Sequence, residues 1–161
     1  MSAQEIPISG GSAPFGRSVR GALAKFPGWF VKAARIAKIE ITNRPDVVQQ
    51  IAMFEHGSRV LFVSPGVGGL LQKALGHELF HAVDDNFNSP HFFTSTNEWR
   101  TIHQKAPYFD IQKYALEPLE YFADQGTKLF MMGAAKMMTT NPDETRFIAG
   151  WVLPTLQREF S

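Results

Sequence analysis

The feature that most constrains this chain is an H-E-x-x-H pattern at residues 77–81, inside a stretch whose apolar residues recur at helical spacing. In a helix, side chains four residues apart project from the same face, so His77 and His81 can reach one metal ion. Glu78 would lie beside that ion, where its carboxylate can take a proton from a water. An accidental match is rare, on the order of one in a hundred such chains. The pattern therefore predicts a zinc site on a helix over residues 70–85, with Glu78 as the general base.

A catalytic zinc ion keeps three protein ligands and one open position, so a third ligand must come from another part of the chain. The sequence contains no cysteine, which leaves histidine and carboxylate side chains as ligands. Two acidic residues, Glu117 and Glu120, lie near the start of a second expected helix. Glu117 directly precedes Pro118, where the chain is still entering that helix. We predict Glu120 as the ligand, because Asp124 lies one turn further on the same face and can accept the outer N–H of a ligand histidine.

Other polar residues near these motifs are candidates for supporting roles. Asp84 and Asp85 follow the second histidine by three and four residues, so one of them can hydrogen-bond a ligand; a solvent-exposed helix end is the alternative. A hydrolytic site also needs a hydrogen-bond donor for the developing oxyanion. We expect Tyr114, shortly before the third ligand, to supply it, with Tyr108 and His103 as alternatives.

Hydrophobic periodicity and helix-capping residues outline the remaining elements. Helices are expected over residues 18–36 with a break at Pro27, from 95 or 96 to 105, from 115 to 138, and after residue 141 with a bend near Pro154. Strands are expected over residues 38–42 and 59–64, whereas residues 47–54 suit either a helix or the first strand of a hairpin. This order predicts an α+β, zincin-like fold: a small twisted sheet packs on the active-site helix, and the second half is mainly helical.

Length and composition indicate one folded domain. The chain has 161 residues, of which 44% are hydrophobic and 19% charged, as in ordinary globular proteins. Residues 1–16 are rich in glycine, serine and proline, so we expect a flexible N-terminal arm before a single catalytic domain over residues 17–161. The arm lacks the pattern of a secretory signal peptide. A cytoplasmic protein, an excised domain and a protein secreted or injected by a signal-independent bacterial system would all look like this.

Charge and hydropathy narrow the choice of partners. The net charge is +1 and the basic residues are scattered, so we expect neither nucleic acid nor an anionic membrane surface as a partner. No apolar run approaches the roughly 18 residues that a membrane-spanning helix needs. The strand expected over residues 59–64 would, at a sheet edge beside the site, pair with a protein or peptide substrate in extended conformation.

Two segments of the chain together resemble the gluzincin peptidases, and more narrowly the catalytic domain of anthrax lethal factor and its relatives. They are HELFHAVDD at residues 77–85 and EYFAD at residues 120–124. The resemblance implies one zinc ion, a general base, and an acidic neighbour of the third ligand. These roles fall on His77, His81 and Glu120 as ligands, Glu78 as base, and Asp124 as neighbour.

The same resemblance bears on the pocket. A tyrosine shortly before the third ligand stabilises the oxyanion in this family, and Tyr114 is one position from a gapless match. Phe80 replaces the small residue often found before the second histidine, which would narrow the pocket. The family includes secreted toxins and injected bacterial effectors that act on host proteins.

We therefore expect a zinc-dependent metalloendopeptidase in which Glu78 activates the water that attacks a peptide bond. Two alternatives stay open. A structural metal in an interaction domain would be closed by a fourth protein ligand, such as His103 or Asp85. A hydrolase with the same chemistry could instead act on peptidoglycan or a small amide, which a wide, saccharide-lined groove would indicate.

Overall fold

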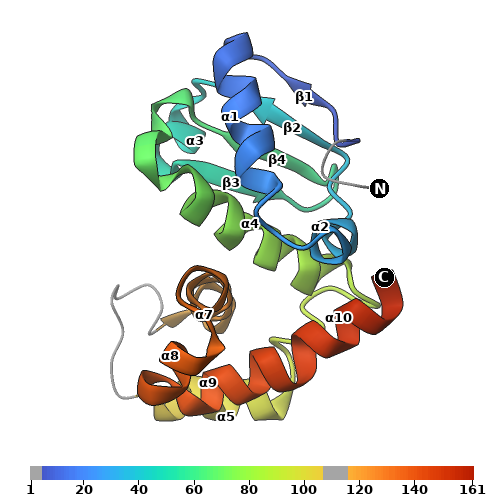
Figure 1. The fold of residues 1–161 in the computed structure, drawn as a ribbon, viewed down its shortest axis with the longest axis vertical. Coiled ribbons are helices and arrows are strands. Elements are labelled where there is room, and N and C mark those ends of the chain that lie inside the picture. The colour runs from blue at the N-terminus through green and yellow to red at the C-terminus, as the bar shows by residue number, and fades with distance from the viewer. Residues whose placement is uncertain (1–4, 107–115) are drawn as a thin grey trace.

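The protein is described by a computed structural model that covers residues 5–106 and 116–161 (Figure 1). Its strands are β1 (Ile8–Ser9), β2 (Lys38–Ile41), β3 (Ala52–Glu55) and β4 (Val60–Val63). Its α-helices are α1 (Ala13–Leu23), α2 (Gly28–Ala34), α3 (Pro45–Gln50), α4 (Leu71–Asn86), α5 (Asn97–Lys105), α7 (Pro118–Met132), α8 (Ala134–Thr140), α9 (Pro142–Phe147) and α10 (Leu153–Phe160). The sheet and the first helices form one half, and the helices from α5 onward form the other (Figure 1).

The four strands form one sheet in the order β1-β2-β4-β3. β2 pairs in parallel with β1 and β4, and β3 is antiparallel to β4. All four residues of β4 are buried, because it has neighbours on both sides. The strand expected over residues 59–64 therefore does not lie at a sheet edge, which was the condition for its pairing with a substrate. The edge strand is β3, which comes from the stretch whose sequence suited either a helix or a strand.

The N-terminal residues differ from the flexible arm expected over residues 1–16. From residue 5 onward they are part of the fold: Ile6 is buried, and β1 pairs with β2. Ser12 caps α1 by accepting a hydrogen bond from a backbone N–H of its first turn, at 3.2 Å. Gly10 has a φ of 75°, and a Cβ there would overlap the backbone of β2. Glycine thus serves close packing at this position, and the folded domain begins before residue 17.

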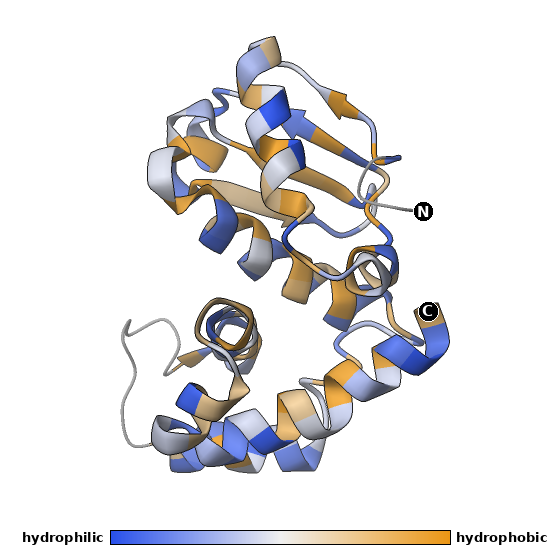
Figure 2. Ribbon diagram, in the orientation of Figure 1, coloured by the Kyte–Doolittle hydropathy of each residue, from blue (hydrophilic) through white to orange (hydrophobic). Residues whose placement is uncertain are grey.

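Helix α4 lies between the two halves and contacts both. It packs against β3, α1 and α2 on one side and against α7 on the other. Leu75, Leu79 and Val83 are fully buried, so this face of α4 is anchored in the core. Figure 2 shows apolar residues along the strands and alternating with polar ones around α4. The face of α4 that carries residues 77 and 81 is thereby left free to line a cavity.

The contact between α4 and α7 depends on one large and one small residue. Phe80 is fully buried, and its ring centroid lies 4.8 Å from that of Phe30 and 5.6 Å from that of Phe122. A Cβ on Gly126 of α7 would overlap the Phe80 ring. The expectation that Phe80 narrows the pocket is therefore wrong, because this side chain points into the core between the helices.

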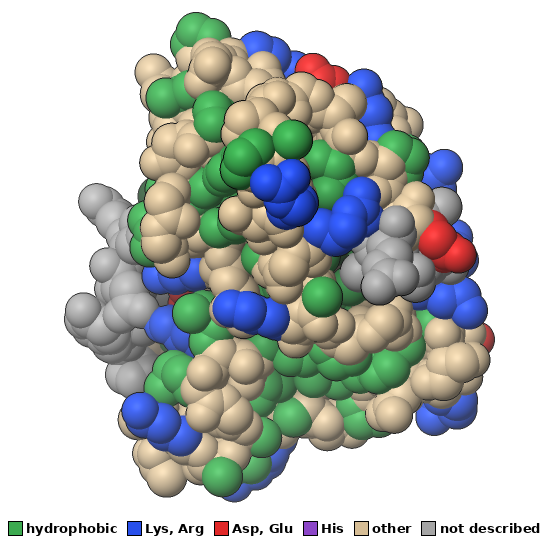
Figure 3. Space-filling view, turned by 45° about the horizontal axis from the view of Figure 1, so that its top comes forward, with side chains coloured by type: hydrophobic (Ala, Val, Ile, Leu, Met, Phe, Trp, Pro, Cys, Tyr) green, Lys and Arg blue, Asp and Glu red, His purple; other side chains and the backbone are tan. Residues whose placement is uncertain are grey.

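The second half is helical, as predicted, but more finely divided than its periodicity suggests. The helix expected over residues 115–138 ends at Met132, because Gly133 has a φ of 86°. The final helix contains a π-helical turn (Ile148–Val152) just before Pro154, whose ring nitrogen has no hydrogen to donate. Within the described part of the chain, the helices are too short or too polar to cross a membrane. On the face drawn in Figure 3, lysine and arginine side chains are scattered and form no single basic patch.

Candidate functional site

The two histidines of the H-E-x-x-H pattern lie one turn apart on α4 and face the same cavity. Their Nε2 atoms are 3.1 Å apart, and their rings are inclined at 78° with centroids 4.8 Å apart. Each side chain is partly exposed, at 18% for His77 and 16% for His81. Because the opposite face of α4 is buried, the core fixes the direction in which both rings point.

Glu120, in the first turn of α7, reaches both histidines. Its Oε2 atom lies 2.9 Å from His77 Nε2, and its Oε1 atom lies 3.5 Å from His81 Nε2. A tetrahedral ion with bonds of 2.0–2.1 Å has ligand atoms about 3.3–3.4 Å apart. The distances from the two Glu120 oxygens to the histidines, 2.9 and 3.5 Å, and the 3.1 Å between the Nε2 atoms lie near that value. With one ligand atom taken from each residue, all three atoms lie within 4.8 Å of one another. Two imidazole nitrogens and a carboxylate oxygen therefore fit one metal ion, as predicted from the two motifs.

The other acidic candidate at this helix has a different place. Glu117 is the residue that precedes the first turn of α7, and it lines the cavity without belonging to the ligand group. Among the described residues, the only such group of close ligand atoms consists of His77, His81 and Glu120. Asp85, considered as a fourth ligand, instead forms a 2.7 Å ion pair with His56. A closed, four-ligand site is thus not formed by these residues.

Glu78 lies beside the ligand group and contacts the edge strand. Its Oε2 atom accepts a hydrogen bond from the backbone N–H of Phe54 in β3, at 2.8 Å. Burial raises the pKa of Glu78, and the neighbouring histidines oppose this rise. A carboxylate with a raised pKa accepts a proton more readily near neutral pH. The structure therefore places a candidate base next to the ligands and fixes its orientation from a second element.

A cleft of about 570 Å³ opens in front of these residues. Its walls are β3 with the preceding residues 49–51, the first three turns of α4, and the start of α7. The backbone N–H of Ser64 donates to the Ile51 carbonyl at 2.8 Å. Along the antiparallel pair β3–β4, residues that hydrogen-bond to the other strand alternate with residues whose backbone groups point away from it. The backbone groups of Ala52 and Phe54 therefore face away from β4. Among the described residues, no strand pairs with this outer edge of β3, which runs along the cleft.

The two aspartates expected to orient a ligand histidine have other partners. Asp84 is buried, and its carboxylate accepts hydrogen bonds from the N–H groups of Phe93 and Thr94 at 2.8 and 3.0 Å. It also accepts one from the Thr94 hydroxyl at 2.5 Å. Burial raises the pKa of Asp84, and these hydrogen bonds oppose the rise. Asp84 therefore holds the loop that follows α4.

Asp124 lies one turn beyond Glu120, as predicted, but its carboxylate points along α7. It accepts a hydrogen bond from Gln125 at 3.1 Å and pairs with Lys128 at 3.0 Å. Its side chain is almost fully buried in that environment. Its contacts are thus those of a residue that stabilises α7.

The candidates for the oxyanion donor are placed as follows. Tyr114 and Tyr108 lie outside the described residues. His103 is buried on α5, and its ring centroid lies 5.6 Å from that of Tyr121. One residue at the cleft was missed by the sequence analysis: His56, at the end of β3, lines it. His56 pairs with Asp85, which lies one turn after His81. The position of Asp85 in the sequence was the feature that could have pointed to a partner such as His56.

The architecture of this chain is also found among solved structures. The fold is similar to that of the PRO-PRO endopeptidase (PPEP-2) from Paenibacillus alvei, with a TM-score of 0.69. The match covers 91% of this chain and 97% of that chain, at 19% sequence identity. No protein-family model and no curated protein sequence matches the chain. The narrower relation to anthrax lethal factor stays a prediction. The likeness confirms the predicted fold class: the chain has the α+β fold of that endopeptidase, with a small sheet packed on α4 and a mainly helical second half.

Proposed function

We propose that the chain is a zinc-dependent endopeptidase that cleaves a protein or peptide bound in the cleft beside β3. The observation that carries this proposal is the group of three ligand atoms, one each from His77, His81 and Glu120, within 4.8 Å of one another in an open cleft with Glu78 beside them. The solved structure with the same fold is that of an endopeptidase, which supports the same class of reaction.

The ligand set favours zinc over other metal ions. Two imidazoles and one carboxylate are a typical set for catalytic zinc, whereas calcium and magnesium prefer oxygen ligands alone. The three residues come from two helices, and the cleft leaves one side of the group accessible. When bound there, zinc supplies a Lewis acid and lowers the pKa of water.

Glu78 is the proposed general base and acid. It takes a proton from the attacking water and delivers it to the nitrogen of the leaving amine. Its hydrogen bond with the Phe54 N–H holds the carboxylate between α4 and the edge strand. Tyr114 remains our proposed donor to the oxyanion, because the sequence places it shortly before Glu120.

The shape of the cleft favours a polypeptide over a small amide or a cell-wall saccharide. An extended peptide can pair with the outward-facing backbone groups of Ala52 and with the Phe54 carbonyl, whereas the Phe54 N–H already donates to Glu78. Apolar side chains, including Ile51, Leu70 and Leu119, line the same cleft and can contact substrate side chains. Edge-strand pairing provides affinity for any sequence, and such side-chain contacts provide selectivity.

The test is a peptide-library digest with zinc-loaded protein. Glu78→Gln should keep its zinc and lose at least about 100-fold in kcat/KM, because the proton acceptor is removed and the ligands remain. The control is Glu159→Gln, which makes the same change at an exposed site on α10 and should cleave like the unaltered protein. Cleavage that survives a chelator, or a fully active Glu78→Gln variant, would contradict the proposal.

A further inference from the structure

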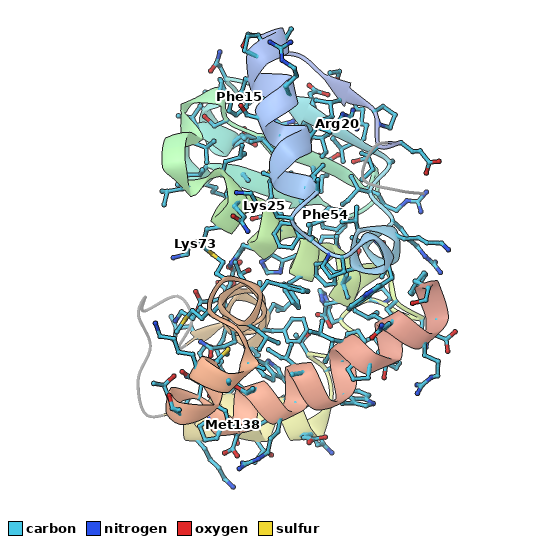
Figure 4. All side chains as sticks on the ribbon, in the orientation of Figure 1. Phe15, Arg20, Lys25, Phe54, Lys73 and Met138 are labelled. Atoms are coloured by element: carbon cyan, nitrogen blue, oxygen red, sulfur yellow. The ribbon has the colours of Figure 1, made fainter. Side chains whose placement is uncertain are left out.

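The helix that carries the ligands also carries a cation in the cleft. Lys73 lies one turn before His77, so residues 73, 77, 81 and 85 form one row along α4. Figure 4 shows Lys73 at the N-terminal end of α4. Among the described residues that line the cleft, it is the only lysine or arginine.

The charge of Lys73 is not neutralised by the described part of the protein. No described carboxylate lies within 4.0 Å of its ammonium group, whereas Lys38 and Lys128 both have such partners. Three glutamates line the same cleft. Two of them, Glu78 and Glu120, are assigned to the base and the metal, and Glu117 belongs to the opposite wall at the start of α7.

We infer that Lys73 forms a subsite for a carboxylate group of the substrate. This inference rests on the proposed peptidase function and adds the substrate feature that the cleft selects. Lys73 is exposed, so its ammonium group is accessible to a bound peptide. At the other end of the row there is no such cation facing the cleft from α4, because residue 85 is an aspartate that pairs with His56. The two ends of the cleft therefore distinguish the two directions of a bound chain.

The position of the carboxylate follows from helix and strand geometry. Four helical residues span about 6 Å, which is the length of about two residues of extended peptide. β3 runs in the same direction as α4, because Phe54 contacts Glu78 and His56 contacts Asp85 further along. A peptide antiparallel to β3 then has its C-terminal part near Lys73. The carboxylate belongs about two residues after the scissile bond.

Two sources of carboxylate satisfy this geometry, and peptide pairs distinguish them. One pair carries aspartate or asparagine two residues after the scissile bond inside a long peptide. The other ends at that position with a free or an amidated C-terminus. In at least one pair, the unaltered protein should cleave the peptide that carries the carboxylate faster than its uncharged partner. Lys73→Met should reduce the difference in cleavage rate by up to about fivefold, the effect of one exposed ion pair. Lys73→Glu should instead favour lysine at that position.

The control is Lys32→Glu, which makes the same charge change on α2, outside the cleft, and should keep the original preference. Peptides should also be titrated onto zinc-loaded Glu78→Gln protein with and without the Lys73 substitutions, which measures selectivity without turnover. Cleavage with an unchanged preference in the Lys73 variants overturns this inference and leaves the peptidase intact. Binding that depends on Lys73 without any hydrolysis overturns the peptidase alone. Neither cleavage nor such binding overturns both.

Discussion

Asp84 stabilises the protein through a fully buried set of hydrogen bonds. Its side chain is 1% exposed, and its carboxylate accepts from two backbone N–H groups and the Thr94 hydroxyl. Asp84→Ala would leave those donors unpaired in the interior, so we expect the free energy of unfolding to fall by about 2–3 kcal/mol. Urea unfolding measures this loss, and zinc content should stay unchanged. An unaltered midpoint, or loss of zinc without loss of stability, would contradict the assignment.

The residues of the site were predictable from the sequence where their spacing alone fixes geometry. The four-residue separation of His77 and His81 determines their common face, whatever the rest of the fold. Asp84 and Asp124 share a helix with a ligand, but the direction of a carboxylate depends on neighbours from distant segments. For Asp84 that neighbour is the loop at residues 93–94, and no local pattern predicts that contact.

The crossing of α4 and α7 positions the three proposed zinc ligands, and Gly126 determines how closely the two helices approach. A Cβ at residue 126 would overlap the ring of Phe80. We expect Gly126→Ala to lower the free energy of unfolding by about 1–3 kcal/mol and to weaken zinc binding, because the helices must separate. Thermal unfolding and zinc titration measure the two effects.

Gly21→Ala is the matched control, because a Cβ there meets nothing within 4 Å. Gly21 lies in the exposed interior of α1, so this change should stabilise the protein by about 0.5–1 kcal/mol. Equal effects at the two glycines would show that helix propensity, and not the packing of Phe80, determines the result.

Helices and strands were predicted best where a capping residue or a hydrophobic repeat shows in the sequence where they begin or which face is buried. Helix α5 begins where Thr96 accepts a hydrogen bond from the Trp99 N–H at 3.2 Å, and that cap is visible in the sequence. The sequence analysis left open whether residues 59–64 lie at a sheet edge, although their composition indicates a central strand. VLFV in β4 is continuously apolar, which is typical of a strand covered on both sides, whereas β3 alternates in burial.

At the scale of the whole molecule, the proposed ion joins the two halves. Two ligands belong to α4 and the third to α7, so zinc should stabilise the folded protein by about 2.7 kcal/mol at 100 times its Kd. Glu120→Ala should abolish this stabilisation, and Glu117→Gln should keep it. The measurement is thermal unfolding at fixed zinc concentrations. A zinc effect that survives Glu120→Ala but not Glu117→Gln would assign the third ligand to the other glutamate.

The fold class could be predicted from the sequence, but the three-dimensional packing of the N-terminal residues could not. Alternation of short strands and helices, followed by helices alone, predicts an α+β fold with the cleft between the halves. The N-terminal residues were misjudged because glycine and serine there suggest a linker. Their role depends on β2, more than 20 residues away, with which β1 pairs and against which Gly10 packs.

We propose that the imidazoles of His77 and His81 and the Glu120 carboxylate hold one zinc ion. Anomalous diffraction at the zinc absorption edge, from crystals of the zinc-loaded protein, would locate this ion. We expect a single strong peak about 2.0–2.1 Å from the Nε2 atoms of His77 and His81 and about 2.0–2.2 Å from a Glu120 oxygen. A peak elsewhere, or histidine rings that diverge without any ion between them, would contradict it.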